Sequence, residues 1–361
     1  MENRKQIQKA GDNSQQYQAG TIIVNQGITE ERVRAIFNEM VPSALQTYTS
    51  DAYNTANQRI EKLEANVLPK INQIDGMLPA FADPAFQILL RKAQQTAAAT
   101  EREDDYSLLT ELLVCHVQKG NDRKNRAGIS QAIEIVDQID NDALCALTVA
   151  HAVSHYLPVS GDFNTGLEVL NTLFSQLMYQ ELPSDVAWID HLDILGAARF
   201  TMVGKLKTFS EYYSSRLDGY VCVGIKENSD EYNKAIEILK NAQINCEILV
   251  ANECLEGFVR LKLTSKSSIE QLGYFKGLTR VAIDDRQQDA LRQVWDLYCQ
   301  DPDLKNKAKT NFMTLWDSYT ALHDLRIWWE NTPQGFQITR VGEILAHTNA
   351  KRCSSEIPDL I

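Results

Sequence analysis

Two histidines, His151 and His155, have the spacing of a pair of metal ligands. Residues four apart lie on one face of a helix, so both imidazoles could bind a single zinc ion. A zinc peptidase motif of this kind would place glutamate directly after the first histidine. Ala152 stands there instead, and no third ligand follows nearby. We therefore interpret the pair as core or surface histidines and predict no metal site.

Two pairs of neighbouring residues carry the atoms of a catalytic dyad. One is Asp190 with His191, followed by Asp193, and the other is Cys115 with His116. Adjacent residues on a helix point in different directions, whereas productive dyads are built between separate elements. Neither pair is therefore expected to be catalytic.

Phosphate-binding loops are missing from the sequence, which contains neither GxxxxGK[ST] nor GxGxxG. The acidic pairs Asp104-Asp105 and Asp284-Asp285 stand at expected helix starts, where carboxylates interact favourably with the helix dipole. We predict no catalytic residues and no cofactor. A hydrolase or nuclease with dispersed catalytic residues is kept as a third hypothesis, supported if changing Asp284 or Asp285 abolished a metal-dependent turnover.

The seven cysteines are odd in number and scattered, and no two have CxxC spacing. Most have apolar neighbours. They are typical of reduced core thiols in a cytoplasmic protein, rather than of a disulfide framework or a zinc site. The seven are Cys115, Cys145, Cys222, Cys246, Cys254, Cys299 and Cys353.

Size and charge narrow the class of protein further. With 361 residues, 44% of them hydrophobic, the chain is long enough for two or three domains with full cores. Its formal net charge of −12 disfavours non-specific binding to nucleic-acid backbones or anionic membranes. The first residues lead into no apolar signal region, and no run approaches eighteen apolar residues, so a soluble cytoplasmic protein without a membrane span is expected.

The opening segment has the most unusual composition. Residues 11–27 read GDNSQQYQAGTIIVNQG, which has one charged side chain and a central β-branched run. Such a segment has high β-propensity and little charge to keep copies apart, while its glycines weaken an isolated strand. We expect copies of residues 14–26 to pair edge to edge. The predicted self-association residues are Gln15, Tyr17, Gln18, Thr21, Ile22, Ile23 and Val24.

Residues 29–78 are predicted to form a long amphipathic helix that begins at the N-cap Thr29, and Pro42 and Pro69 are expected to kink or restart it. Its apolar positions recur every three or four residues with fours in excess, which argues against a sustained left-handed coiled coil. Two interpretations remain open. The apolar stripe either faces the core of a bundle or meets the same helix of another subunit.

Residues 79–215 show helical periodicity throughout and predict a helical domain without a fixed repeat. The expected helices span residues 84–98, 104–119, 128–138, 140–156, 164–179 and 185–203.

Residues 216–361 predict an α+β region. Strands are expected at 220–225, 246–250 and 258–263, and helices at 230–242, 266–276, 284–300 and 303–328. A short strand, a Thr339 cap and a final helix follow, and together they suggest a small winged-helix-like module. Such a module could contact DNA through Arg340, Lys351 and Arg352. Trp328 and Trp329 are interpreted as core residues that pack between this module and the preceding helix.

The fold class predicted from these patterns is mainly α. It comprises an oligomerising β segment (1–28), a long kinked helix (29–78), a helical domain (79–215) and the α+β region (216–361).

Several motifs of this chain occur together in one known family. They are GDNSQQYQAG with Gly27-Ile-Thr, a helix bearing Ala52, Ala56, Arg59 and Glu61, and the closing segments 338–342 (ITRVG) and 349–352 (NAKR). In these features the chain resembles an uncharacterised bacterial protein family whose members open with the same glycine-, asparagine- and glutamine-rich stretch. The resemblance implies no catalytic residues, and similar openings occur in bacterial anti-phage defence proteins. Residues 17–20 (YQAG) also loosely resemble the core of amyloid-like signalling motifs.

The leading functional hypothesis is a non-enzymatic homo-oligomeric scaffold or sensor that assembles through its N-terminal β segment, in bacterial anti-phage (antiviral) defence. Its expected partners are itself and other defence proteins, through protein–protein interaction. The alternative is a nucleic-acid-binding regulator that uses the C-terminal winged-helix-like module.

Overall fold

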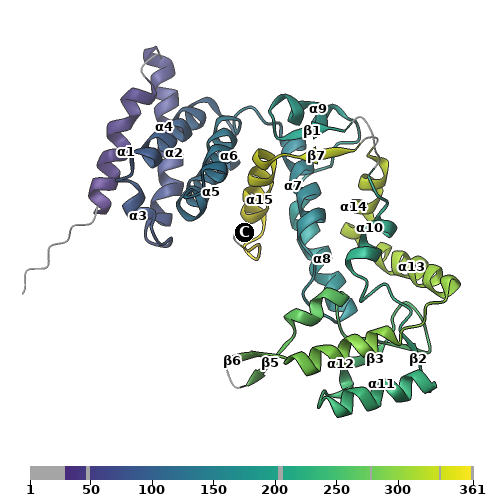
Figure 1. Ribbon diagram of the computed structural model, residues 1–361. Coiled ribbons are helices and arrows are strands. Elements are labelled where there is room, and N and C mark those ends of the chain that lie inside the picture. Colours follow the sequence, from purple (N-terminus) through teal and green to yellow (C-terminus); the bar gives the residue numbers. More distant parts are fainter. Residues whose placement is uncertain (1–28, 46–48, 202–205, 277–278, 333–334, 359–361) are drawn as a thin grey trace, which may run out of the picture.

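The computed structural model describes residues 29–45, 49–201, 206–276, 279–332 and 335–358, and this part of the chain is mainly helical (Figure 1). The predicted mainly α class is therefore confirmed. Within the described ranges, no helix has both the length and the apolar character needed to cross a membrane. The predicted β segment 1–28 lies outside the described residues.

Six helices form the N-terminal part of a helical array. They are α1 (Glu30–Ala44), α2 (Ser50–Ile71), α3 (Met77–Ala80), α4 (Pro84–Ala99), α5 (Glu103–Lys119) and α6 (Arg123–Glu134). α1 packs on α4, and α2 packs on α4 and α5. The Thr29 side chain accepts a hydrogen bond from the Arg32 N–H at 3.3 Å, which confirms the predicted N-cap.

The predicted long helix 29–78 is wrong, because α1 ends at Ala44 and α2 begins only at Ser50. The break does not fall at a proline. Pro42 lies within α1 and Pro69 in the last turns of α2, and neither ends its helix. The apolar stripe, exemplified by Phe37, is buried in the core of its own chain. Of the two interpretations, the core-facing helix is confirmed.

A second group of helices is completed by the last helix of the chain. α7 (Asn141–His155), α8 (Phe163–Leu177) and α9 (Ala187–Ile194) follow one another, and α15 (Arg340–Cys353) lies between α7 on one side and α5 and α6 on the other (Figure 1). The Thr339 side chain caps α15 by accepting from the Gly342 N–H at 3.2 Å, as predicted. A Cβ at Gly342 would lie 2.0 Å from the Ala197 carbonyl oxygen, so this close approach requires glycine.

The finer prediction of a winged-helix-like module is not confirmed. The strand before α15, β7 (Phe336–Ile338), pairs antiparallel with β1 (Ala198–Phe200), which follows α9 in the sequence. β7 and α15 therefore belong to the main helical array, not to a separate terminal unit.

Three helices extend the array beyond α8. They are α10 (Phe209–Arg216), α13 (Pro302–Asp317) and α14 (Thr320–Asn331), and α14 packs on α8. Aromatic rings fill the space between them: the Trp316 ring centroid lies 4.6 Å from that of Tyr213 and 5.5 Å from that of Phe209. The predicted single helix 303–328 is thus two helices, α13 and α14.

Residues 225–298 form a small α+β unit with its own core, so the predicted region 216–361 divides between two cores. A three-stranded antiparallel sheet has the order β2-β4-β3, and α11 and α12 pack against each other beside it. The predicted helix 266–276 is wrong, because these residues form a short 3₁₀ helix and then a strand. The elements are β2 (Ile225–Lys226), α11 (Asp230–Asn241), η1 (Cys246–Ile248), β3 (Leu249–Ala251), β4 (Phe258–Leu261), η2 (Lys266–Gln271), β5 (Gly273–Lys276), β6 (Thr279–Ala282) and α12 (Asp285–Asp296).

A buried arginine joins the two units. Arg260 of β4 is fully buried and forms an ion pair with Glu253 at 2.8 Å. Its Nη1 also donates to the carbonyl oxygens of Gly161, at 3.2 Å, and Gly219, at 3.5 Å. A Cβ at Gly161 would lie 1.9 Å from the Lys262 carbonyl oxygen, so the chain between α7 and α8 touches the sheet backbone directly.

Candidate functional site

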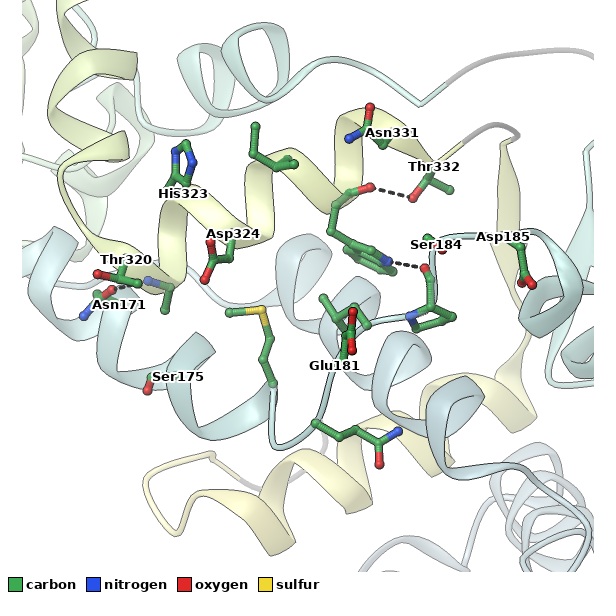
Figure 2. A pocket seen from close by; sticks show the side chains of 17 residues that line it. Asn171, Ser175, Glu181, Ser184, Asp185, Thr320, His323, Asp324, Asn331 and Thr332 are labelled. Atoms are coloured by element: carbon green, nitrogen blue, oxygen red, sulfur yellow. Dashed lines mark hydrogen bonds between the residues drawn. The ribbon is translucent and has the colours of Figure 1, made fainter.

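A hollow of the described surface lies between α8, α14 and the loop that joins α8 to α9 (Figure 2). We call it the α8–α14 groove, and its volume is about 670 Å³. Ligand pockets in proteins are commonly of this size. Asn171 and Ser175 come from α8, Glu181 and Asp185 from the loop, and further residues, including Asp324, come from α14.

Hydrogen bonds hold the walls of the groove together. The Trp328 indole Nε1 of α14 donates to the Pro183 carbonyl oxygen of the loop at 2.9 Å. At the other end, the Ala321 N–H donates to Asn171 Oδ1 at 3.1 Å, which joins the start of α14 to α8. Both contacts are drawn in Figure 2. The groove is therefore preformed, because its two helices and its loop are tied directly to one another.

One face of α14 supplies the longest wall. Thr320, Asp324, Ile327 and Asn331 recur at intervals of three or four residues, so they lie along the same side of the helix. Ile327 is 41% exposed, which is unusual for a large apolar side chain on an otherwise well-packed helix. Together with the half-buried Met178, it gives the groove an apolar surface between polar rims.

The groove is electrostatically negative. Glu181, Asp185 and Asp324 line it, while no lysine or arginine does. Arg326 of α14 does not offset this charge, because it forms an ion pair with Asp317 at 2.7 Å and does not line the groove.

A second hollow shares the loop and extends the negative surface. It is lined by loop residues 180–185 together with Asp140, Asp142 and His191. Asp140 and Asp185 also have local roles. Asp140 accepts from the Asp142 N–H at 3.2 Å at the start of α7, and Asp185 accepts from the Ala187 N–H at 3.0 Å at the start of α9.

The chemistry offered by the α8–α14 groove is recognition. Its polar groups are carboxylates, amides, hydroxyls and the imidazole of His323. The His323 Nδ1 lies 3.5 Å from Oδ1 of Asp317, which does not itself line the groove. Carboxylates around an apolar surface suit a ligand that is both cationic and apolar, and they repel phosphates.

The predicted histidine pair lies at a different place, on α7 facing α15. His151 and His155 stack with ring centroids 4.1 Å apart, and the His151 ring also lies 6.0 Å from that of His347 on α15. Tyr156 Oη lies 2.9 Å from His347 Nδ1. The third histidine was missed because it follows the pair by almost two hundred residues in the sequence.

Burial decides the charge of His151. Desolvation, reinforced by His155 and His347, lowers the pKa of His151 to about 3, so its imidazole is neutral at physiological pH. His151 is 2% exposed, so of the two positions that the sequence left open, core or surface, it occupies the core. Among the described residues, no group of three or more potential ligands is arranged to hold a metal ion.

In each neighbouring pair the histidine contacts another part of the fold. His191 Nε2 accepts a hydrogen bond from the Asp140 N–H at 3.1 Å, so it is engaged with the start of α7 and not with Asp190. His116 has its pKa lowered by burial first and by Arg126 second, and its ring packs beside Phe86 with centroids 6.0 Å apart.

Two of the buried cysteines are poor nucleophiles. All seven are free of disulfide bonds, and Cys115, Cys145 and Cys254 are buried. Burial raises the pKa of Cys145 and of Cys254 to about 12, which keeps both thiols protonated and therefore poor nucleophiles.

Both acidic pairs lie at helix starts, as predicted. Asp104 forms an ion pair with Arg352 at 3.0 Å, and buried Asp105 accepts from Arg102 Nε at 3.0 Å. Asp284 caps α12 by accepting from the Gln287 N–H at 2.8 Å.

The residues predicted to contact nucleic acid are dispersed along α15. Arg340 stands at its start and forms an ion pair with Glu343 at 2.9 Å. Arg352 stands about 18 Å further along the helix and is paired with Asp104, and Lys351 is half-buried. The seven residues predicted for self-association, from Gln15 to Val24, lie outside the described residues.

Sequence analysis missed the α8–α14 groove altogether. The one available signal was Ile327, an apolar residue outside the buried stripe of its helix that stands beside Trp328. Trp328 and Trp329 are both buried in the main core, and the Trp328 ring lies 5.9 Å from that of Trp188. Trp188 in turn contacts Phe336 of β7, with centroids 5.1 Å apart.

Comparison with known proteins places the chain in a family. Neither the curated proteins nor the solved structures contain a match to the chain. A protein-family model matches residues 27–360, and thus begins after the GDNSQQYQAG stretch. Because the match covers far more than half of the sequence, the chain belongs to this family, whose function is unknown.

Proposed function

We propose that the chain is a non-enzymatic homo-oligomeric scaffold or sensor that assembles through residues 14–26. The composition of this segment carries the proposal, because it joins amide side chains to a β-branched run without a single charged residue. Strands from several copies gain backbone hydrogen bonds and amide ladders that a lone strand lacks. The helical arrays attached to them are then held at high effective concentration.

The placement of the reactive side chains supports a role without catalysis. Three of the groups that the sequence offered for chemistry have structural roles: His191 binds a backbone N–H, Cys254 is buried and protonated, and Asp284 caps a helix. These groups stabilise helices and cores, as expected of a scaffold.

The α8–α14 groove supports protein–protein interaction as the mode of action. An exposed apolar side chain, Ile327, lies between polar rims on a rigid wall, which is the arrangement of a site that anchors one side chain of a partner. Anti-phage defence is the biological setting that we propose, on the strength of the resemblance in the opening stretch 11–20.

The mass of the protein in solution tests this proposal. Removing residues 1–27 should reduce the oligomer to a monomer in light scattering, and Ile22→Lys combined with Val24→Lys should act in the same direction in the full chain. Glu237→Lys on the exposed face of α11 is the control and should leave the mass unchanged. An identical mass for the wild type and the deletion variant contradicts the proposal.

The alternative, a nucleic-acid-binding regulator, has weaker support. Two of its three cations, Arg340 and Arg352, pair with carboxylates of the same chain. A mobility-shift titration at two salt concentrations tests it, because binding through phosphates weakens steeply as salt rises.

A further inference from the structure

The α8–α14 groove suits a ligand with positive charge beside an apolar group. Glu181 and Asp324 line the groove and have no ion-pair partner among the described residues. Ile327, one turn after Asp324 on α14, is exposed in the same groove. Rim charges of one sign steer a ligand of the opposite sign and reject one of the same sign. An acidic or phosphorylated ligand is thus disfavoured.

One segment of this chain has the required chemistry. Residues 4–9 read RKQIQK and place Arg4, Lys5 and Lys9 around Ile7 in a chain whose net charge is −12. The lengths also agree. Six extended residues span roughly 17 Å, and the face of α14 from Thr320 to Asn331 rises about 17 Å, at 1.5 Å for each residue.

We propose that residues 4–9 of one copy bind in the α8–α14 groove of a second copy. Ile7 packs on Ile327 and its apolar surroundings, while the basic side chains pair with Glu181 and Asp324. The inference rests on the proposed self-association and adds a second contact to it, separate from the pairing of residues 14–26.

The arrangement of the helices favours binding between copies. α1, which follows the basic segment, packs on α2 and α4 at one end of the array, whereas α14 packs on α8, α10 and α13 at the other end (Figure 1). A contact from one end of a subunit to the opposite end of the next is heterologous, so it builds a ring or an open filament.

A charge exchange in the full chain tests the proposal. The groove variant carries Glu181→Lys and Asp324→Lys, and the arm variant carries Arg4→Glu, Lys5→Glu and Lys9→Glu. The control variant carries Glu231→Lys and Glu237→Lys on the exposed face of α11 and has the same net charge as the groove variant. Mass is measured by light scattering over a range of concentrations.

We expect the groove and arm variants each to associate about ten-fold more weakly than the wild type, and the control variant to associate normally. An equimolar mixture of groove and arm variants should recover wild-type mass, because each reversed arm then meets a reversed groove. Wild-type mass for the groove variant, or no recovery in the mixture, overturns the inference.

The two proposals fail in different ways. If deleting residues 1–27 dissociates the protein but the groove variant keeps full mass, only the inference about the groove is refuted. If the wild type is itself a monomer at all concentrations, both are refuted.

Discussion

His151 should make the stability of the protein depend on pH in a specific direction. In the folded state, burial among α7 and α15 lowers its pKa to about 3, whereas an unfolded histidine has a pKa of about 6.5. Below pH 6.5 the unfolded chain therefore binds a proton that the folded chain does not. The free energy of unfolding must fall as the pH is lowered from 6.5 towards 3, by about 1.4 kcal/mol for each pH unit.

Between pH 7 and pH 5 this linkage amounts to about 2 kcal/mol, because the unfolded histidine passes from mostly neutral to mostly charged over that interval. Replacing His151 with leucine removes the titrating group. The variant should lose about 2 kcal/mol less stability than the wild type when both are moved from pH 7 to pH 5.

Urea denaturation followed by tryptophan fluorescence, at both pH values, measures the difference. His116, whose pKa burial also lowers, contributes equally in both proteins and cancels in the comparison. Val153→Ala, at a fully buried position of the same helix that carries no titratable group, is the matched control and should keep the wild-type pH dependence. If the His151 variant and the wild type lose the same free energy of unfolding between pH 7 and pH 5, the conclusion that the buried His151 imidazole stays neutral is refuted.

Three further predictions concern contacts that hold the fold and the groove. Arg260→Met should lower the free energy of unfolding by about 3 kcal/mol, because it leaves the Glu253 carboxylate without its ion-pair partner and two carbonyl oxygens without a donor. Equal denaturation midpoints for the variant and the wild type would contradict this. Gly161→Ala should cost about 2 kcal/mol in thermal unfolding, because its Cβ would lie 1.9 Å from a backbone oxygen. Trp328→Phe keeps an aromatic ring but removes the hydrogen bond to Pro183, so it should cost about 1 kcal/mol and speed amide exchange in the 180–185 loop; unchanged exchange would show that the loop is held by other contacts.

Local patterns predicted several helix starts correctly. Thr29 and Thr339 identified two helix starts because an N-cap depends on a hydrogen bond to residues two or three positions on, which the sequence alone specifies. The helix-start role of Asp284 could be anticipated for the same reason. The burial of His151 could not, because the sequence allowed a core or a surface position. The end of α1 at Ala44 could not be anticipated from the sequence. Proline is the residue that most disfavours a helix interior, yet Pro42 lies within α1.

Contacts between distant segments could not be predicted. The α8–α14 groove joins residues near 180 to residues near 325, and no local pattern records that these helices pack together. β7 looked like part of a terminal module because its partner, β1, is separated from it by more than a hundred residues. The helix predicted at 266–276 failed because β5 gains its stability from pairing with β6 rather than from its own propensity.

The position of α15 has a consequence for biosynthesis. α15 contacts α5, α6 and α7, yet 184 residues separate His155, where α7 ends, from Arg340, where α15 begins. At roughly 5–20 residues per second, a ribosome needs about 10–40 s to make the intervening chain. For that time the helices that will later enclose α15 expose apolar surface, so a stalled or truncated product would be an aggregation-prone client for chaperones.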